Sequence, residues 1–291
     1  MSLWHVIVLA IVQGFAELLP VSSSAHVIVA AELMHENMSL PDNALLLVLL
    51  HTGTMFAVIV YFWRRWLNEF LSSWVEFYRF AKLIFVSSLL SGLVFVPINK
   101  VVEHVLSRPG HRADIEALFH KLNWIAPALA IVGALILYAG LREARRPEPA
   151  NGTSPRGVSW LEAVVMGILQ GFAIPFRGFS RSGATISGGL LTGGDRGQVE
   201  SYSFAMAVAI TPLAIAWELR RVYRTAHTAG LAPHWGAVLT PGVLGMVFSF
   251  LAGLLALKWL SRWLESGKWY IFGIYCLLAA CVVAFLYHAG Y

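Results

Sequence analysis

The chain has 291 residues, of which 58% are hydrophobic and only 13% are charged. A soluble globular domain carries about 25% charged residues, so this composition excludes a disordered chain and argues against a soluble enzyme. Two cysteines are too few for a secreted disulfide framework. The net charge of +5, without a basic cluster beside stacked aromatic residues, gives no sign of nucleic-acid binding. The length fits one compact membrane domain, 1–291.

Six apolar segments are long enough to cross a bilayer as helices, because a crossing needs about 20 apolar residues. They are Ala44–Phe62, Phe80–Val96, Trp124–Gly140, Tyr202–Leu219, Trp235–Leu257 and Trp269–His288. Tryptophan and tyrosine at several of their ends are typical of the membrane interface. The first residues show neither a basic start nor a small-residue cleavage site, so we expect no removable signal peptide.

Two further apolar stretches are each interrupted by a polar break. The first, Leu3–Leu33, is broken at Leu19–Ser24, and the second, Trp160–Leu191, is broken at Pro175–Gly183. An irregular backbone is tolerated at membrane depth only where protein or a water-filled cavity surrounds it. We therefore predict that each stretch forms a re-entrant helix–loop–helix unit.

The two interrupted stretches resemble each other. Both carry the tetrapeptide Gln-Gly-Phe-Ala, at 13–16 and 170–173, and both continue into a Ser-x-Ser sequence. Three predicted spans separate them, so the two units would enter the membrane from opposite faces. This favours an inverted repeat, 1–141 and 158–291 with a linker at 142–157, and a site where the breaks meet at the midplane. The predicted fold class is an all-α integral membrane protein with six transmembrane helices and two re-entrant units.

Lysine and arginine are unevenly distributed over the predicted loops. One face of the membrane holds 12 of the 21 and the other holds 7. The richer face comprises loops 63–82, 141–159, 193–201 and 258–268, and the poorer face comprises loops 97–123 and 220–234. Because cytoplasmic loops carry the excess of basic residues, we predict that the richer face is cytoplasmic and that both termini lie outside.

Two polar side chains, Gln13 and Glu17, lie near the end of the first half-helix. Residues four apart share one face of a helix, so the two side chains should point the same way. A carboxylate at membrane depth is costly and usually serves a function. The alternative is a glutamate that only hydrogen-bonds to the broken backbone.

The first break supplies three hydroxyls and an imidazole, from Ser22, Ser23, Ser24 and His26. The first N–H groups of a helix are unpaired and its dipole is positive there, so a helix start can bind an anion. One of the serines would cap the helix in any case. His26 is harder to explain as a cap.

The second break contains Arg177 and Arg181, together with the hydroxyls of Ser180, Ser182 and Thr185. Guanidinium groups bind phosphate oxygens bidentately, and the hydroxyls add donors. The alternative is that the arginines extend to the interface or pair only with the acid of the first break. An acid, a base or nucleophile, and a phosphate clamp together indicate phosphoryl transfer. An acidic residue facing a phosphate also suggests a bridging divalent cation.

Two segments carry a specific resemblance: Q-G-F-A-E-L-L-P-V-S-S-S-A-H at 13–26 and G-F-S-R-S-G-A-T at 178–185. They resemble the signature regions of the undecaprenyl-diphosphate phosphatase family, the bacitracin-resistance membrane phosphatases, and the likeness covers most of the chain. The resemblance implies removal of one phosphate from undecaprenyl diphosphate, which recycles the lipid carrier of cell-wall synthesis. It also implies a divalent cation, Mg²⁺ or Ca²⁺. The protein would lie in the bacterial inner membrane, with its site open to the periplasm or outer leaflet.

We assign the predicted site residues to three roles. The catalytic residues are Glu17, His26, Ser23 and Arg181. The substrate-binding residues are Gln13, Ser22, Ser24, Arg177, Ser180, Ser182 and Thr185. Glu17 with Gln13 would hold the metal. His51 aligns with a polar position of the family, and we interpret it as a packing or relay residue.

The sequence also departs from the family pattern. Arg177 stands where the family usually has proline before glycine, and Ala25 replaces a usual glycine. One residue is inserted between Gln170 and Ser180 relative to the family pattern. The acidic residue expected before F-S-F falls on Ser201, with Glu200 one place earlier. These departures leave the predicted catalytic residues in place.

Alternatives remain open for the mechanism. Either His26 or Ser23 could attack the terminal phosphorus while the other assists, and a metal-activated water is a third route. A transporter or flippase for an anionic lipid is the main rival, because inverted repeats are a transporter architecture. The Glu17–His26 pair favours hydrolysis, since simple translocation has less need of an acid and a base. The expected partners are a polyprenyl diphosphate lipid and the bilayer, and the sequence leaves a homodimer open.

Overall fold

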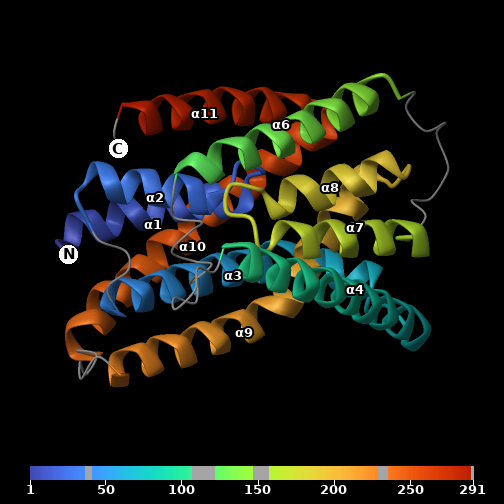
Figure 1. The fold of residues 1–291 in the computed structure, drawn as a ribbon. Coiled ribbons are helices and arrows are strands. Elements are labelled where there is room, and N and C mark those ends of the chain that lie inside the picture. The colour runs from blue at the N-terminus through green and yellow to red at the C-terminus, as the bar shows by residue number, and fades with distance from the viewer. Residues whose placement is uncertain (37–40, 107–121, 147–156, 229–234, 290–291) are drawn as a thin grey trace. The chain divides into compact units, whose positions relative to one another are not determined.

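The computed structural model describes residues 1–36, 41–106, 122–146, 157–228 and 235–289. Every regular element in these ranges is an α-helix, as predicted (Figure 1). The elements are α1 (Leu3–Leu18), α2 (Ser23–Leu33), α3 (Pro41–Glu69), α4 (Trp74–Leu106), α6 (Leu122–Ala144), α7 (Trp160–Ala173), α8 (Arg181–Leu191), α9 (Arg196–Thr228), α10 (Trp235–Glu265) and α11 (Tyr270–His288).

Within the described ranges, six helices are long and apolar enough to cross a membrane. Their apolar parts are Leu45–Glu69, Trp74–Val102, Trp124–Ala144, Arg196–Arg220, Leu239–Glu265 and Tyr270–His288. These six correspond to the six predicted spans, but several run further into charged sequence than the hydropathy indicates. At the end of α3, an ion pair between Arg65 and Glu69, one turn apart at 2.9 Å, supports the polar extension.

The two interrupted stretches form pairs of short helices. α1 packs on α2, and α7 packs on α8 (Figure 1). α1 has 16 residues and α7 has 14, fewer than the roughly 20 that a crossing needs. The second break is shorter than predicted, because Ser180 caps α8 and the helix already begins at Arg181. Re-entry of these pairs into a membrane is compatible with the short helices and stays a prediction.

The chain divides into two compact units. The first comprises Met1–Leu19, Ser23–Trp63 and Ala207–Leu260, and the second comprises Pro20–Ser22, Arg64–Met206 and Ser261–Tyr291. The proposed repeat boundaries, 1–141 and 158–291, stay a prediction. Most of the predicted linker at 142–157 lies outside the described residues, since these exclude 147–156.

In the first unit, α1, α2 and α3 share an apolar core. Its buried residues are Val6, Leu9, Ala10, Val27, Ala31, Leu46 and Leu50. Gly14 lets α10 approach α1 closely, because a Cβ atom there would lie 2.6 Å from the Ser249 carbonyl oxygen. The Ser249 hydroxyl in turn donates to the carbonyl of Leu50 at 2.9 Å. These contacts hold the C-terminal end of α1, which carries Glu17, in a fixed position.

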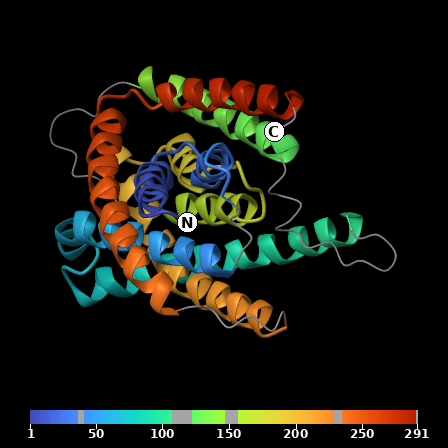
Figure 2. The same cartoon turned by 90° about the vertical axis from the view of Figure 1, so that its left-hand side faces the viewer.

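In the second unit, two serines of α4 join it to α7. The hydroxyls of Ser87 and Ser91 each donate to a backbone carbonyl of α7, at 2.9 Å in both cases. A Cβ atom on Gly171 would lie 2.5 Å from the Ser91 carbonyl oxygen. Small residues that bring two backbones together are typical of helix packing in membranes. Also in this unit, α6 and α11 pack along each other (Figure 2).

Candidate active site

Glu17 lies in the last turn of α1, where three polar side chains approach its carboxylate oxygen Oε2. Gln13 donates to it through Nε2 at 3.2 Å, and Ser23 donates through its hydroxyl at 2.5 Å. His51 of α3 places Nε2 at 3.5 Å from the same oxygen. The predicted shared face of Gln13 and Glu17 is therefore confirmed.

The surroundings of this carboxylate are largely buried. The Glu17 side chain is 16% exposed, and Gln13 is buried. A carboxylate taken out of water is stable only when it is paired or hydrogen-bonded. The donors from Gln13 and Ser23 supply such bonds, and these bonds to a charged acceptor are stronger than bonds between neutral groups.

The serines of the first break take different positions. Ser22 is buried and has a φ of 68°, in the left-handed region that residues other than glycine seldom adopt. Such backbone outliers gather at functional sites, where the surroundings hold them in place. Ser23 opens α2, and His26 follows one turn later on the same face. Ser24 and His26 are both partly exposed.

The first turn of α8 gathers most of the hydroxyls predicted for the second break. The Ser180 hydroxyl accepts the backbone N–H of Gly183 at 3.2 Å and lies 3.4 Å from the Ser182 hydroxyl. Both serines are buried, whereas Arg181 between them is partly exposed. A guanidinium beside the positive end of a helix suits a phosphate group.

Thr185 is fully buried in this turn. Its hydroxyl donates to the carbonyl of Arg181 at 2.9 Å and lies 2.6 Å from the hydroxyl of Ser203 on α9. The Thr185 hydroxyl thus holds the start of α8 against α9, and its role in substrate binding stays a prediction. We did not predict Ser203 as a site residue, because a contact across 18 residues leaves no signal in local spacing.

Arg177 lies in a tight turn of the second break. The N–H of Phe179 donates to the carbonyl of Phe176 at 3.0 Å, which places Arg177 and Gly178 in the two central positions. Gly178 has a φ of 95°, as a type II turn requires at its third residue. Proline favours the second residue of such a turn, so the proline usual in related sequences would suit the same backbone. Arg177 therefore keeps the turn and adds a guanidinium, which is partly exposed.

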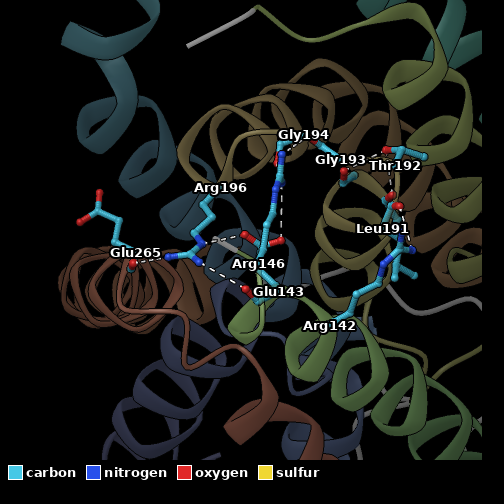
Figure 3. Close-up of polar contacts among 11 residues, drawn as sticks. Arg142, Glu143, Arg146, Leu191, Thr192, Gly193, Gly194, Arg196 and Glu265 are labelled. Carbon is cyan, nitrogen blue, oxygen red and sulfur yellow. Dashed lines mark hydrogen bonds and ion pairs between the residues drawn. The ribbon is translucent and has the colours of Figure 1, made fainter. Parts of the chain in front are cut away.

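The end of α8 opposite Arg181, with the two glycines that follow it, is held by Arg142 of α6 and by Arg146, which lies just after α6 (Figure 3). They donate to the carbonyls of Leu191, Gly193 and Gly194, at 3.3, 2.8 and 3.0 Å respectively. The last carbonyls of a helix lack partners within the helix, and cations complement the negative end of its dipole. We refer to these contacts as the arginine clamp.

A buried ion pair lies beside the arginine clamp (Figure 3). Glu143 of α6 is 5% exposed, and Arg196 at the start of α9 donates to it at 2.8 Å. Arg146 approaches the same carboxylate at 3.6 Å. The ends of α6, α8 and α9 are thereby tied together, which fixes α8 and the Arg181 at its other end.

The donor set near Glu17 limits how a cation could be bound. Among the described residues, no three side chains of His, Cys, Asp or Glu gather into a metal site. Gln13 contacts Glu17 through its amide nitrogen rather than its oxygen. A cation that takes its remaining ligands from water and substrate phosphates needs only one or two carboxylates, as Mg²⁺ does. The carboxylate of Glu17 fits that kind of site.

Comparison with known proteins places this chain in a family. Residues 6–282 match the family described as bacitracin resistance protein BacA. The chain belongs to this family. The resemblance drawn from the two signature regions is therefore confirmed. With six apolar helices long enough to cross a membrane among its described residues, this BacA family member is a multi-pass membrane protein.

Several relatives match over nearly their whole length. Undecaprenyl-diphosphatase 2 of Acinetobacter baylyi is 46% identical over 285 residues, which cover 97% of each chain. Undecaprenyl-diphosphatase 2 of Burkholderia thailandensis is 30% identical over 304 residues and 99% of each chain. Undecaprenyl-diphosphatase of Rhodopirellula baltica is 30% identical over 286 residues and 98% of each chain. The names of these relatives denote hydrolases.

Proposed function

We propose that the protein hydrolyses undecaprenyl diphosphate to undecaprenyl phosphate and inorganic phosphate. Family membership and the names of the relatives support this activity. The single structural observation that carries it is the 2.5 Å hydrogen bond from the Ser23 hydroxyl to Glu17, because a nucleophile needs an adjacent proton acceptor. Hydrolysis would recycle the lipid carrier of cell-wall synthesis in the bacterial inner membrane and thereby confer bacitracin resistance. The site would open to the periplasm or outer leaflet.

The two clusters would divide the chemistry. Ser23 Oγ would attack the terminal phosphorus as its proton passes to Glu17. The bond from that phosphorus to the bridging oxygen would break, and undecaprenyl phosphate would leave. Water would then attack the phosphoserine, with His26 accepting its proton. The bond from phosphorus to Ser23 Oγ would break as Oγ takes back the proton from Glu17, and inorganic phosphate would leave. Arg181 and the N–H groups that open α8 would hold the diphosphate, since charge stabilisation dominates phosphoryl transfer.

The remaining predicted residues would support binding. The donors to the phosphate oxygens would come from Ser22, Ser24, Arg177, Ser180, Ser182 and Thr185. A bound divalent cation, Mg²⁺ or Ca²⁺, would neutralise part of the diphosphate charge. Glu17 would supply a carboxylate ligand to it, with Gln13 beside that carboxylate.

The first test is phosphate release by detergent-purified protein from undecaprenyl or farnesyl diphosphate, with Mg²⁺, with Ca²⁺ and with EDTA. We expect cation-dependent release by the wild type and its loss in Glu17→Gln and Arg181→Ala. The matched controls are Glu32→Gln and Arg145→Ala, which change exposed residues outside the site and should retain activity. No release from folded wild type would overturn the proposal, and lipid movement without phosphate release would favour a transporter.

A second test identifies the nucleophile. Protein quenched during turnover of substrate labelled in the terminal phosphate would be digested and analysed by mass spectrometry. A label stable in acid and located on Ser23 would support the mechanism. An acid-labile label on His26 would replace Ser23 as the nucleophile, and rapid turnover without any label would indicate direct attack by water.

A further inference from the structure

His51 is a polar residue within an apolar span, Leu45–Glu69, and both of its ring nitrogens have acceptor oxygens near them. Nδ1 lies 2.8 Å from the carbonyl oxygen of Leu47, and Nε2 lies 3.5 Å from Oε2 of Glu17. All three residues belong to the first unit. The imidazole is thus fixed between a carbonyl and a carboxylate.

The contact with Leu47 determines which ring nitrogen carries a hydrogen. A carbonyl oxygen can only accept, so Nδ1 must be the donor. In the neutral ring, Nε2 then presents a lone pair to the carboxylate of Glu17. The separation of 3.5 Å exceeds the usual 2.7–3.2 Å of an N–H···O hydrogen bond. Two electron-rich atoms in this position are stabilised when a positive charge lies between them.

The arrangement has the features of a metal-binding histidine. Such a histidine usually donates its other ring N–H to a carbonyl or carboxylate, which fixes the tautomer and the ring orientation. Two donors about 2.1 Å from one ion, at angles of about 90–110°, lie roughly 3.0–3.4 Å apart. The observed separation is close to this range. The His51 side chain is 42% exposed, so water or substrate oxygens could complete the ion's coordination.

We propose that Nε2 of His51 and the carboxylate of Glu17 bind one divalent cation together. The carboxylate of Glu17 can keep the bonds from Gln13 and Ser23 and also bind a cation, because its two oxygens together offer about four lone-pair sites. Imidazole favours transition ions, whereas oxygen-only sites favour Mg²⁺ and Ca²⁺. The mixed site therefore prefers Mn²⁺ to Ca²⁺. Gln13 acts here as a donor that orients Glu17. The inference rests on the proposed function only for the cation's part in hydrolysis.

The experiment measures Mn²⁺ binding to the detergent-purified full chain without substrate. Pulsed electron paramagnetic resonance should detect a nitrogen coupled to bound Mn²⁺ in the wild type and no such coupling in His51→Ala. The affinity for Mn²⁺ should fall about tenfold or more in that variant, the range seen when the support of a metal site is lost. Persistence of the nitrogen coupling in His51→Ala, or unchanged affinity, would overturn the inference.

Two further variants complete the design. His5→Gln is the matched control, because His5 pairs with Glu36 at 2.7 Å in the same unit and lies outside the site. It should keep both the coupling and the affinity. His51→Gln replaces nitrogen by an amide oxygen, so it should lose the nitrogen coupling and shift the ion preference from Mn²⁺ towards Ca²⁺.

The readout separates this inference from the proposed function. Mn²⁺ binding through His51 without phosphate release would retain the inference and reject the phosphatase. Phosphate release with no effect of His51→Ala on Mn²⁺ binding would retain the phosphatase and reject the inference. Size-exclusion chromatography of each variant would show that the comparison is made between folded proteins.

Discussion

The two broken helices share the tetrapeptide Gln-Gly-Phe-Ala but use its glutamine differently. In α1, Gln13 donates to the carboxylate of Glu17 at 3.2 Å. In α7, Gln170 donates to the hydroxyl of Ser91 on α4 at 3.2 Å, and the position four residues later is Ile174. Gln13 thus orients a candidate catalytic carboxylate, whereas Gln170 stabilises the packing of α7 on α4.

The glycine of the tetrapeptide has the same role in both helices. A Cβ atom on Gly14 or Gly171 would lie within 2.6 Å of a backbone carbonyl oxygen of a neighbouring helix, in α10 and α4 respectively. The glycine that the two stretches share therefore serves helix packing in both. The residues that differ, above all Glu17 in α1 and Ile174 after α7, indicate that the candidate catalytic carboxylate belongs to α1 alone.

Glu17 should be the most sensitive residue, because of the two helix pairs, α1–α2 and α7–α8, only the first has a carboxylate at this position. Glu17→Gln should lower kcat by about 10²–10⁴, the range of general acid–base catalysis. Adding Ile174→Glu to that variant should not restore activity, although residue 174 is exposed enough to accept the change. Initial rates of phosphate release check both. Recovery in the double variant would mean that a carboxylate on either helix can do the chemistry, and would contradict the distinct role of α1.

The next effect concerns Arg181, the positively charged side chain at the start of α8. Arg181→Ala should lower kcat about 10²-fold or more, because it removes charge stabilisation of the transferred phosphoryl group. Arg181→Lys should restore only part of this loss, since lysine lacks the bidentate geometry of guanidinium. Rates measured over a range of substrate concentrations would test this. Equal activity of lysine and arginine would show that only the charge matters.

The shared glycines should affect stability in both pairs alike. Gly14→Ala and Gly171→Ala should each cost about 1–3 kcal/mol, the usual effect of overpacking. Gly92→Ala is the matched control, because a Cβ atom at Gly92 meets nothing within 4 Å. Alanine there should be neutral or stabilising by up to about 1 kcal/mol. Reversible unfolding in mixed detergent would provide the three values, and a tolerant Gly14 or Gly171 would contradict the packing role.

The smallest effects should separate the two glutamines. Gln170→Met should cost about 1 kcal/mol of stability, the usual value of one hydrogen bond, and leave kcat within about twofold. Gln13→Met should lower activity about tenfold with a similar change in stability, because Glu17 loses a donor that orients it. Parallel unfolding and rate measurements would test the pair. If the two variants changed stability and activity to the same extent, the two glutamines would not have different roles.

Much of the fold could be predicted because the bilayer imposes simple rules of length and polarity. The six spans follow from runs of about 20 apolar residues, and the two breaks follow from polar residues within shorter runs. α8 begins earlier than the sequence predicts, because its first residues, Arg181 to Gly183, resemble a loop unless Ser180 is recognised as the helix cap. Local sequence therefore gave the elements but not all of their ends.

The candidate site was predictable only where its contacts are local. Gln13 and Glu17 are one turn apart, so helical periodicity placed them together. The approach of His51 to Glu17 depends on how α3 packs, although a histidine in an apolar span was itself a signal of function. The burial of Thr185 against Ser203 likewise depends on packing between helices. Such contacts have no periodic trace in the sequence.

The arginine clamp has a consequence for how the chain could be engineered. Arg142, Arg146 and Arg196 are among the basic residues that would direct the orientation of the chain during insertion. Arg142 and Arg146 bind carbonyls at and just after the end of α8, while Arg146 and Arg196 pair with the buried Glu143. Moving these charges to the opposite loops would weaken the predicted topology signal and would also leave the carbonyls of Leu191, Gly193 and Gly194 without these donors. With the predicted orientation, insertion and folding would be coupled through shared residues, and an inverted variant would need new caps as well as new charges.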